Sequence, residues 1–285
     1  MQAIPKKKLE RAIRELSPLS DAAQALVSLT NDRDHTGADV VEIVERDASL
    51  TIRVLRIANS PVIAPISPVE SVQHAIALMG EDVVVTAAFA ISANWMHESL
   101  SGYGPDAKIF ENWLKTAVSA SLIGKRFGRE DLASLAYTGG LLHDIGKVVL
   151  SDFLEPASAA VIADVSSGEA EDWLAAERAA LGFNHCEVGA MVADHFGLGP
   201  ALRAVIGHHH APNNAPAEHR QLVEIVHVAD GVRAMVGGDS SADSLSYRLD
   251  RSMLDSLGFG PEDLSEIICD TLDASRKLVE AISGA

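Results

Sequence analysis

Histidine and aspartate residues gather in the second half of the chain at positions that suit metal chemistry. The chain has 11 histidines, which include a His-Asp pair and a run of three. Imidazole nitrogens and carboxylate oxygens are usual ligands of Zn, Fe, Mn and Ni, and the helices of a bundle can direct them at one ion. The candidate ligands are His143, Asp144, His185, His208, His209 and Asp230. Were this site active, its catalytic residues would be His143, Asp144 and Lys147.

The same side chains also have structural interpretations. Buried imidazole and carboxylate groups need partners in any fold, so His143 and Asp144 could be a hydrogen-bonded pair between helices. For His185 and the three consecutive histidines, ligation and an ordinary structural role both stay open. Lys147 is expected to pair with an acid such as Asp144 rather than to contact phosphate. Cys186 adjoins His185, but adjacent residues on a helix point apart, so no nucleophile is predicted there.

The elements that must position these residues are predicted to be helices. Apolar residues recur at helical spacing, and alternating strand patterns are scarce. The predicted segments are Val40–Val44, Leu50–Ala58, Val72–Met79, Trp113–Ile123, Leu132–Leu150, Trp173–Leu181, Val188–Phe196 and Leu222–Met235. The run Val83–Val85 has strand propensity, but the Ala-rich stretch that follows to Met96 favours a buried helix. The predicted fold class is therefore all-α.

Two capping patterns mark helix starts. Ser67, followed by Pro68 and Glu70, forms an S-x-x-E box, which predicts that a helix starts there. Asn184 and Glu187 form a second box ahead of the helix that includes His185. Both boxes are predicted to serve only as helix caps.

Composition limits the partners and the compartment. Lys and Arg number 23 and Asp and Glu number 40, which gives a formal net charge of −17. Such a surface repels phosphate backbones, so nucleic acid is not an expected partner. Two cysteines are too few for a disulfide scaffold. The N-terminus lacks the apolar core of a signal peptide, and no apolar run reaches the ~20 residues that span a bilayer. We therefore expect a cytoplasmic protein with no membrane partner.

The stretch His143-Asp144-Ile145-Gly146-Lys147 resembles the signature of the HD superfamily of metal-dependent phosphohydrolases. Residues from about 15 to 210 resemble more specifically the HDOD family, the HD-related output domains of bacterial signalling. The matching blocks are Leu16–Leu19, Asp47–Leu50, Leu55–Ser60, Ser71, Ala75–Ile76, Leu78–Gly80, Trp113, Glu177, Gly182–His185 and Ile206 with His208–Pro212. The resemblance implies a regulatory domain rather than an enzyme.

Two departures from the HD pattern bear on the chemistry. Catalytic relatives have a ligand histidine in a Trp-x-His-Ser pattern on the preceding helix, and here Lys115 occupies that position. An ammonium is a poor ligand and repels a cation. Cyclic-dinucleotide phosphodiesterases of the HD-GYP type have Gly-Tyr-Pro after a double histidine, where this chain has Ala211-Pro212-Asn213-Asn214. We therefore expect negligible hydrolysis and favour the structural role for His143 and Asp144.

The resulting expectation is a non-catalytic regulatory module of signal transduction that binds signalling proteins or a small-molecule ligand. No cofactor is expected to be required, although an incomplete ligand set could bind a divalent metal (Mn, Fe, Zn or Ni) weakly. The competing hypotheses are a metal-dependent phosphohydrolase acting on a nucleotide or cyclic dinucleotide, and a scaffold with an apolar docking groove. The irregular stretch Ser99–Pro105 predicts an N-terminal helical lobe over residues 1–100 and an HD-like helical bundle with C-terminal helices over residues 105–285.

Overall fold

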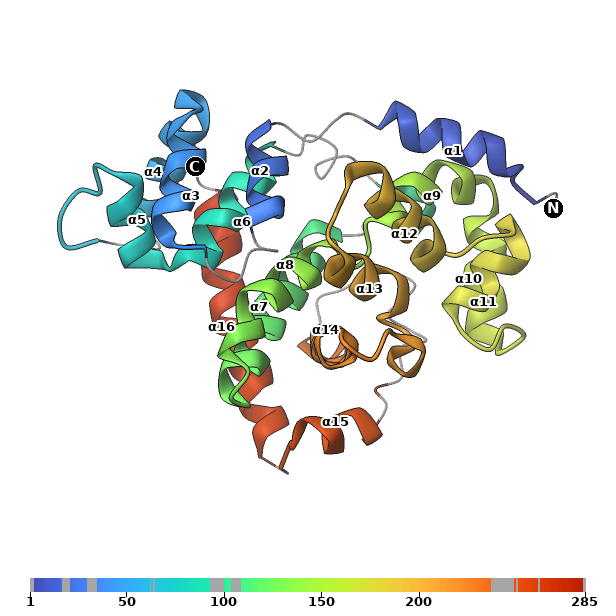
Figure 1. The fold of residues 1–285 in the computed structure, drawn as a ribbon. Coiled ribbons are helices and arrows are strands. Elements are labelled where there is room, and N and C mark those ends of the chain that lie inside the picture. Colours follow the sequence, from blue (N-terminus) through green and yellow to red (C-terminus); the bar gives the residue numbers. More distant parts are fainter. Residues whose placement is uncertain are drawn as a thin grey trace. The chain divides into compact units, whose positions relative to one another are not determined.

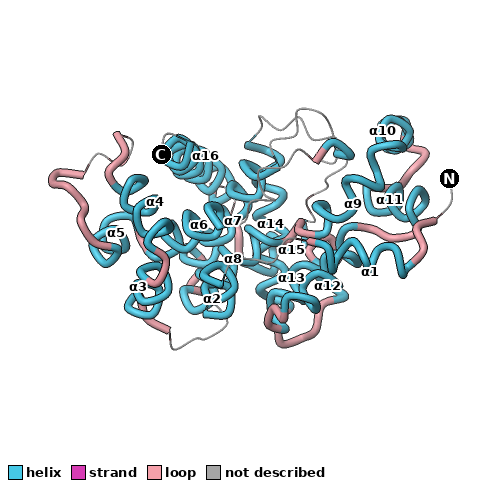
Figure 2. Tube along the Cα trace, turned by 90° about the horizontal axis from the view of Figure 1, so that it is seen from above, coloured by secondary structure: helices cyan, strands magenta, loops and turns pink. Residues whose placement is uncertain are grey.

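The computed structural model describes residues 3–16, 21–29, 35–61, 63, 65–92, 100–103, 109–236, 249, 251–260 and 262–283. Within these ranges the chain forms helices joined by loops, and no strand (Figures 1 and 2). The predicted all-α fold is therefore confirmed.

The chain divides into two compact units. Unit 1 comprises Met1–Leu16 and Glu98–Thr271, and unit 2 comprises Ser17–His97 and Leu272–Ala285. The division after His97 lies close to the predicted boundary. The units differ from the predicted lobes at both ends of the chain, because the first 16 residues belong to unit 1 and the last residues, from Leu272, belong to unit 2.

Unit 1 is a helical bundle with the predicted His-Asp residues inside it. Its helices are α1 (Lys6–Glu15), α7 (Ile109–Arg126), α8 (Glu130–Leu142), α9 (Gly146–Leu154), α10 (Ser158–Ser167), α11 (Trp173–Leu181), α12 (His185–Phe196), α13 (Pro200–His208), α14 (Arg220–Val236), α15 (Arg251–Leu257) and the first part of α16 (Asp263–Ser283), with the short 3-10 helices η2 (Ser101–Tyr103), η3 (Glu155–Ala157) and η4 (Pro212–Asn214). Helix α7 packs against α8 and α14, and α12 packs against α9 and α13. Ile123, Val205 and Val226 are among the apolar residues buried in this bundle.

Helix α1 belongs to this bundle although it lies at the other end of the sequence. It buries Leu9 and Ile13 and packs against α9 and α12. The backbone N–H of Ile4 donates to the carbonyl of Leu181 at 2.8 Å. The Lys8 ammonium lies 5.1 Å from the centre of the Phe153 ring on α9. These contacts account for the assignment of the first residues to unit 1.

Unit 2 is a smaller group of helices. They are α2 (Asp21–Leu29), α3 (Gly37–Glu45), α4 (Ala48–Ala58), α5 (Val72–Met79) and α6 (Glu81–Ser92). Each contributes buried apolar side chains to one core, which includes Leu26, Val40, Val54, Val72 and Val84. The Val83–Val85 run is helical, as predicted, and the predicted continuation past Ser92 to Met96 lies outside the described residues.

The predicted start of helix α5 is wrong. The helix begins after Ser71, whose hydroxyl accepts from the backbone N–H of His74 at 3.1 Å. The segment after Ser67 stays irregular because Asn59 binds it: the Asn59 amide donates to the Val69 carbonyl, and its oxygen accepts from the Val69 N–H, both at 2.8 Å. The Asn184 box of α12 is present as predicted.

The single helix predicted over Leu132–Leu150 is also wrong. A turn at residues 143–145 separates α8 from α9, and in it the Lys147 N–H donates to the Asp144 carbonyl at 2.8 Å. This three-residue spacing is tighter than that of an α-helix and lets the chain change direction. Gly146 then starts α9 in close contact with α12, since a Cβ there would lie 2.0 Å from the carbonyl oxygen of His185. The His-Asp motif therefore lies at a helix junction.

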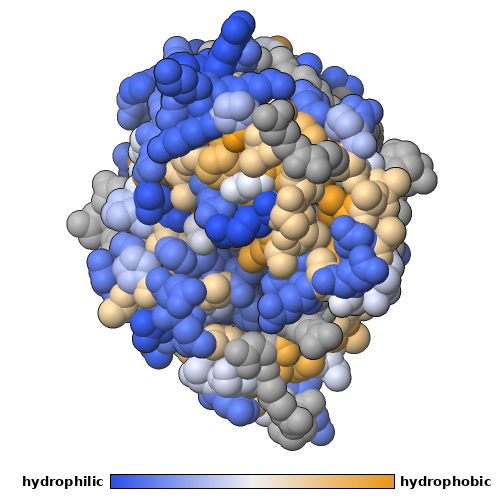
Figure 3. Space-filling model, turned by 90° about the vertical axis from the view of Figure 1, so that its right-hand side faces the viewer, coloured by the Kyte–Doolittle hydropathy of each residue, from blue (hydrophilic) through white to orange (hydrophobic). Residues whose placement is uncertain are grey.

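The described helices include none that is long and apolar enough to cross a bilayer. The face of the molecule in Figure 3 is mainly hydrophilic, with a hydrophobic patch in its upper half.

Candidate functional site

Unit 1 brings most of the predicted site residues together in one buried group, which we call the HD cluster. Its side chains come from the turn between α8 and α9, the starts of α9 and α12, the residue after α13 and the middle of α14. Its members are His143, Asp144, Lys147, His185, His209 and Asp230, all of them buried. The remaining candidate, His208, is half-buried and lies outside the cluster. Adjacent helical residues differ by about 100° in direction, so His208 and His209 point apart.

The Asp144 carboxylate lies at the centre of the cluster. Its Oδ1 is 3.4 Å from Nε2 of His185 and 3.6 Å from Nε2 of His209. Its Oδ2 is 3.2 Å from Nε2 of His143 and 2.6 Å from the Lys147 ammonium. One carboxylate therefore faces three imidazoles and a buried ammonium, and the predicted pair between Lys147 and Asp144 is present.

Both carboxylates of the cluster are bonded to cations of the chain itself. Besides the pair of Lys147 with Asp144, the Arg233 Nε donates to Oδ1 of Asp230 at 2.9 Å. The same Asp230 oxygen lies 3.5 Å from Nε2 of His143. Arg233 and Lys147 are each about as buried as their partners, with 4% of each residue exposed. The negative charge of the cluster is therefore largely compensated within the protein.

The charged neighbours change the acid–base properties of the cluster. Burial alone would lower the pKa of His143, but the Asp144 and Asp230 carboxylates outweigh it and raise the pKa to about 9. Burial alone would raise the pKa of Asp144, but the charges of His143 and Lys147 hold that pKa well below its usual range. For Asp230, Arg233 and His143 likewise outweigh burial and lower the pKa. Without a metal ion the raised pKa favours the cationic form of His143, and an ion binding to its Nε2 would have to displace that proton.

Hydrogen bonds to surrounding groups fix the orientation of the three imidazoles. The Nδ1 atoms pair with oxygen acceptors, namely His143 with the Gly140 carbonyl (2.7 Å), His185 with the Glu177 carboxylate (2.8 Å) and His209 with the Ile206 carbonyl (3.1 Å). Because these oxygens accept, each Nδ1 donates and each Nε2 is left to face the cluster. Metal-bound histidines usually have this arrangement.

Three buried atoms without hydrogen bonds indicate whether the cluster suits a metal ion. Nε2 of His143, Nε2 of His185 and Oδ1 of Asp144 are buried and make no hydrogen bond of acceptable geometry. Ligands held at about 2.0–2.2 Å around a tetrahedral ion lie roughly 3.3–3.6 Å apart, close to the separations around Asp144. By donor type and spacing, His143, Asp144 and His209, whose ligand atoms lie within 4.8 Å of one another, fit a divalent ion, with His185 and Asp230 next to them. The pairs with Lys147 and Arg233 oppose such binding because they compensate the carboxylate charge.

Glu177, which the sequence analysis named only as part of the family resemblance, contacts a histidine of the site. It is fully buried, and its carboxylate accepts from the Tyr103 hydroxyl at 2.6 Å and the Trp173 indole at 3.1 Å. Its second oxygen accepts from both the backbone N–H and Nδ1 of His185, each at 2.8 Å. Glu177 thereby orients a cluster histidine. Because Trp173 and Glu177 are four residues apart on one helix face, their contact could have been predicted from the sequence.

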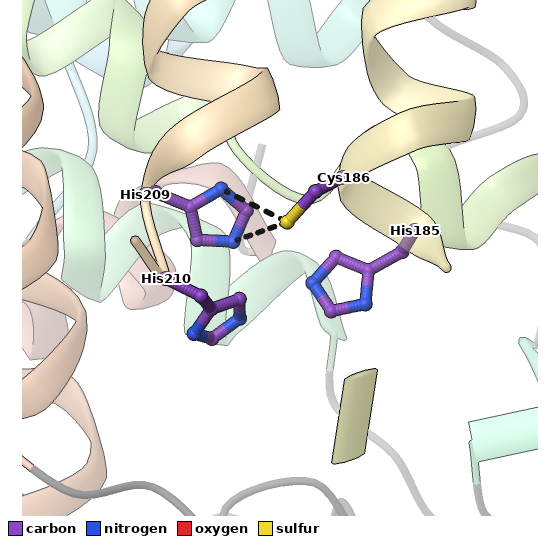
Figure 4. Close-up of side chains that lie close together, drawn as sticks. All are labelled: His185, Cys186, His209 and His210. Carbon is purple, nitrogen blue, oxygen red and sulfur yellow. Dashed lines mark hydrogen bonds between the residues drawn. The ribbon is translucent and has the colours of Figure 1, made fainter. Parts of the chain in front are cut away.

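The sequence analysis did not predict Arg233 as a neighbour of the site, considered Cys186 only as a nucleophile, and considered His210 only within the run of three histidines. Cys186 Sγ lies 3.8 Å from Nδ1 and 3.9 Å from Nε2 of His209, and the ring centres of His209 and His210 are 4.2 Å apart (Figure 4). Of these three residues, only Arg233 could have been linked to the site from the local sequence, because it follows Asp230 by three residues on α14.

Comparison with known proteins identifies the family. A Treponema pallidum (strain Nichols) protein of uncharacterised function is 20% identical over 213 residues, which cover 74% of this chain and 41% of that protein. The chain thus spans less than half the length of this relative. A predicted signal transduction protein from Marinobacter aquaeolei VT8 superposes with a TM-score of 0.76 and 22% identity over 99% of this chain and 61% of that chain.

A predicted phosphohydrolase from Shewanella amazonensis SB2B superposes with a TM-score of 0.66 and 24% identity over 95% of this chain and 97% of that chain. At such identities the two structural matches show a shared fold. The family model of the HDOD domain matches residues 16–212. Because this match covers well over half of the sequence, the chain belongs to the HDOD family.

Proposed function

We propose that this chain is a non-catalytic regulatory module of signal transduction, in which the HD cluster stabilises unit 1. The observation that supports this most strongly is the internal compensation of both cluster carboxylates, by Lys147 at 2.6 Å from Asp144 and by Arg233 at 2.9 Å from Asp230. Both pairs join residues three apart in the sequence, and they leave the carboxylates little net charge to attract a catalytic cation.

The burial of the cluster also supports a structural role. His143 is 1% exposed, Asp144 5% and Asp230 2%. A hydrolytic metal centre needs an open coordination position that water and substrate can reach. Side chains as enclosed as these are better suited to stabilising the fold than to binding a phosphate ester.

One residue of helix α7 also supports this proposal. At the position where the HD resemblance implies a ligand histidine, the helix has the half-buried Lys115. The partners that we propose are signalling proteins or a small molecule, and the proposed compartment is the cytoplasm. The hydrophobic patch in Figure 3 is the kind of surface that a protein partner covers.

A metal-dependent phosphohydrolase is the second candidate, favoured by the buried cluster atoms that have no hydrogen bond. The name of the Shewanella amazonensis structure agrees with it. A bound ion would supply Lewis acidity that activates water and neutralises phosphate charge. In that case the chain's own Lys147, Arg233 and Glu177 would position the surrounding ligands.

Hydrolysis assays separate the two candidates. Purified protein is incubated with Mn²⁺ or Fe²⁺ and bis(p-nitrophenyl) phosphate, a cyclic dinucleotide or a nucleoside triphosphate. The comparison is with Asp144→Asn and with Asp194→Asn, a control at an exposed carboxylate paired with Arg203 at 2.6 Å. We expect the parent and both variants to release product at the same background rate. Metal-dependent turnover that Asp144→Asn abolishes and Asp194→Asn retains would refute the regulatory proposal.

A further inference from the structure

Helix α1 concentrates positive charge on a strongly acidic protein. Its 10 residues include five basic and two acidic side chains, a net charge of +3, whereas the whole chain carries −17. The helix lies next to α9 and α12 in unit 1 (Figure 1) and ends directly before residue 16, where the HDOD match begins. All five basic side chains are exposed, namely Lys6, Lys7, Lys8, Arg11 and Arg14. This charge is therefore a feature of the chain outside the matched HDOD region.

Three of these cations form a stripe along one face of α1. Lys7, Arg11 and Arg14 are at positions i, i+4 and i+7, so they share a face over two helical turns, about 10 Å. Arg11 Nε pairs with Oε1 of Glu15 at 2.7 Å, and such an exposed pair gives way to a competing carboxylate at little cost. Lys7 and Arg14 pair with no acidic side chain of the described ranges. We call these three residues the basic stripe.

The opposite side of α1 fixes the helix to unit 1. Leu9 is fully buried and Ile13 is 4% exposed, and both belong to the side that packs against α9 and α12. Before the helix, the Ile4 N–H donates to the Leu181 carbonyl at 2.8 Å. The basic stripe is therefore held in place before any partner binds, which lowers the entropic cost of binding.

The basic residues of the first turn destabilise α1 itself. The N-terminus of a helix has a partial positive charge and favours acidic side chains. In α1 this turn begins with Lys6, Lys7 and Lys8, includes no acidic residue, and follows Pro5, which provides no side-chain cap. Cations in positions where they cost stability indicate a function for the charge, because sequences depart from local rules mainly at functional sites.

The geometry favours an acidic protein segment as the partner over a nucleic acid or a lipid surface. In ~0.1 M salt the Debye length is about 10 Å, the length of the stripe, so a short acidic segment interacts mainly with the stripe. A duplex or a bilayer extends much further and would also face the acidic remainder of the chain. A helix that binds membranes also inserts its apolar face. In α1 that face, with Leu9 and Ile13, is buried in unit 1.

We propose that Lys7, Arg11 and Arg14 form a docking surface for an acidic segment of a signalling protein. The proposal rests on the regulatory function and deepens it by giving the chemistry of a partner. Carboxylates of the segment replace water at Lys7 and Arg14 and compete with Glu15 for Arg11. In an extended segment with an acid at every second residue, the acids lie about 6.7 Å apart. The rise from Lys7 to Arg11 along the helix is similar, about 6 Å.

Peptide binding tests the docking surface. A rhodamine-labelled peptide of alternating Glu and Ser is titrated with the full chain in ~0.1 M salt, and a peptide of alternating Gln and Ser is the neutral probe. Fluorescence anisotropy should show binding of the acidic peptide only. The affinity should fall at least about tenfold in ~1 M salt, where the Debye length is about 3 Å. The double variant Lys7→Glu with Arg14→Glu should also bind at least about tenfold more weakly, because two repulsions replace two attractions.

A charge-matched control separates the stripe from the net charge. Arg53→Glu with Arg56→Glu, at exposed positions of α4, changes the net charge equally and should bind as the parent does. Lys7→Arg with Arg14→Lys keeps both charges and should retain binding. Circular dichroism shows that each variant is folded.

Three results overturn the docking surface. The first is no preference for the acidic peptide over the neutral one, and the second is equal weakening by the control pair on α4. The third is binding to phosphatidylglycerol vesicles or duplex DNA that is tighter than peptide binding and is lost in the α1 variant. Metal-dependent hydrolysis would refute the regulatory function, whereas failure of peptide binding alone leaves that function standing.

Discussion

At the scale of single residues, the contacts of the Asp144 carboxylate determine the electrostatics of the site. Its two oxygens face Lys147 and three histidines within 3.6 Å, and burial leaves water no access to most of them. In such surroundings a carboxylate is stabilised by fixed positive groups, and those groups depend equally on the carboxylate. The pair of His143 with Asp144 is therefore one part of a larger network.

Removal of this carboxylate tests the structural role directly. We expect Asp144→Ala to lower the free energy of unfolding by about 3–5 kcal/mol, because it leaves buried cationic groups without their counter-charge. Thermal or urea unfolding of the parent and the variant is measured in chelator and again with added Zn²⁺ or Mn²⁺. Most of the loss should already be present in chelator. If the loss occurs only when metal is added, the carboxylate acts through an ion. Asp194→Ala, at the surface of α12, should change stability by less than about 1 kcal/mol.

At the scale of secondary structure, the turn between α8 and α9 and the close approach of α9 to α12 place the motif. Gly146 is at the contact, since a Cβ would lie 2.0 Å from the His185 carbonyl oxygen and 2.6 Å from the Gly189 nitrogen. Both neighbours are backbone atoms, which cannot move aside as a flexible side chain can. The glycine of the His-Asp-Ile-Gly-Lys stretch thus has a packing function.

Substitution at two glycines distinguishes close packing from helix propensity. We expect Gly146→Ala to destabilise unit 1 by about 3 kcal/mol or more, at the upper end of overpacking, because the backbones of α9 and α12 must separate. In Gly207→Ala, within α13, the new Cβ would lie 3.7 Å from the nearest side chain, that of Ala190. That variant should gain roughly 0.5–1 kcal/mol. Urea unfolding monitored by circular dichroism gives both values, and equal effects at the two positions would refute the packing argument.

At the scale of the whole molecule, each compact unit combines two segments that are far apart in the sequence. Helix α1 joins unit 1, whose other residues begin at Glu98. Leu9 is fully buried, and its helix packs against α9 and α12, the helices next to the HD cluster. The N-terminal residues therefore contribute to the stability of the part that contains the site.

Truncating a buried side chain of α1 should destabilise unit 1 more than unit 2. We expect Leu9→Ala to reduce stability by about 2–5 kcal/mol and to accelerate amide hydrogen exchange in α9 and α12 more than in α3 and α4. Arg14→Ala, at an exposed position of the same helix, is the control and should leave exchange unchanged. Faster exchange that is confined to α3 and α4 would show that α1 belongs functionally with unit 2.

The sequence by itself determined the helical fold class, the family, and most members of the HD cluster. Helical periodicity and caps such as Asn184 depend on neighbours within a few residues, so they can be predicted from local sequence. The His-Asp motif and the positions of His185, His209 and Asp230 were visible for the same reason. The sequence misplaced the start of α5, because the Asn59 side chain binds Val69, ten residues further along the chain.

Only the tertiary structure decided how these residues combine. It excluded His208 from the cluster, placed His185 and His209 against Asp144 and Asp230 against His143, and gathered Cys186 and His210 beside His185 and His209. Which imidazoles face which carboxylate, and which ligand atoms meet, depends on distances between helices that are far apart in sequence. Those distances are fixed by packing at points such as Gly146, where helices approach until their backbone atoms are in contact.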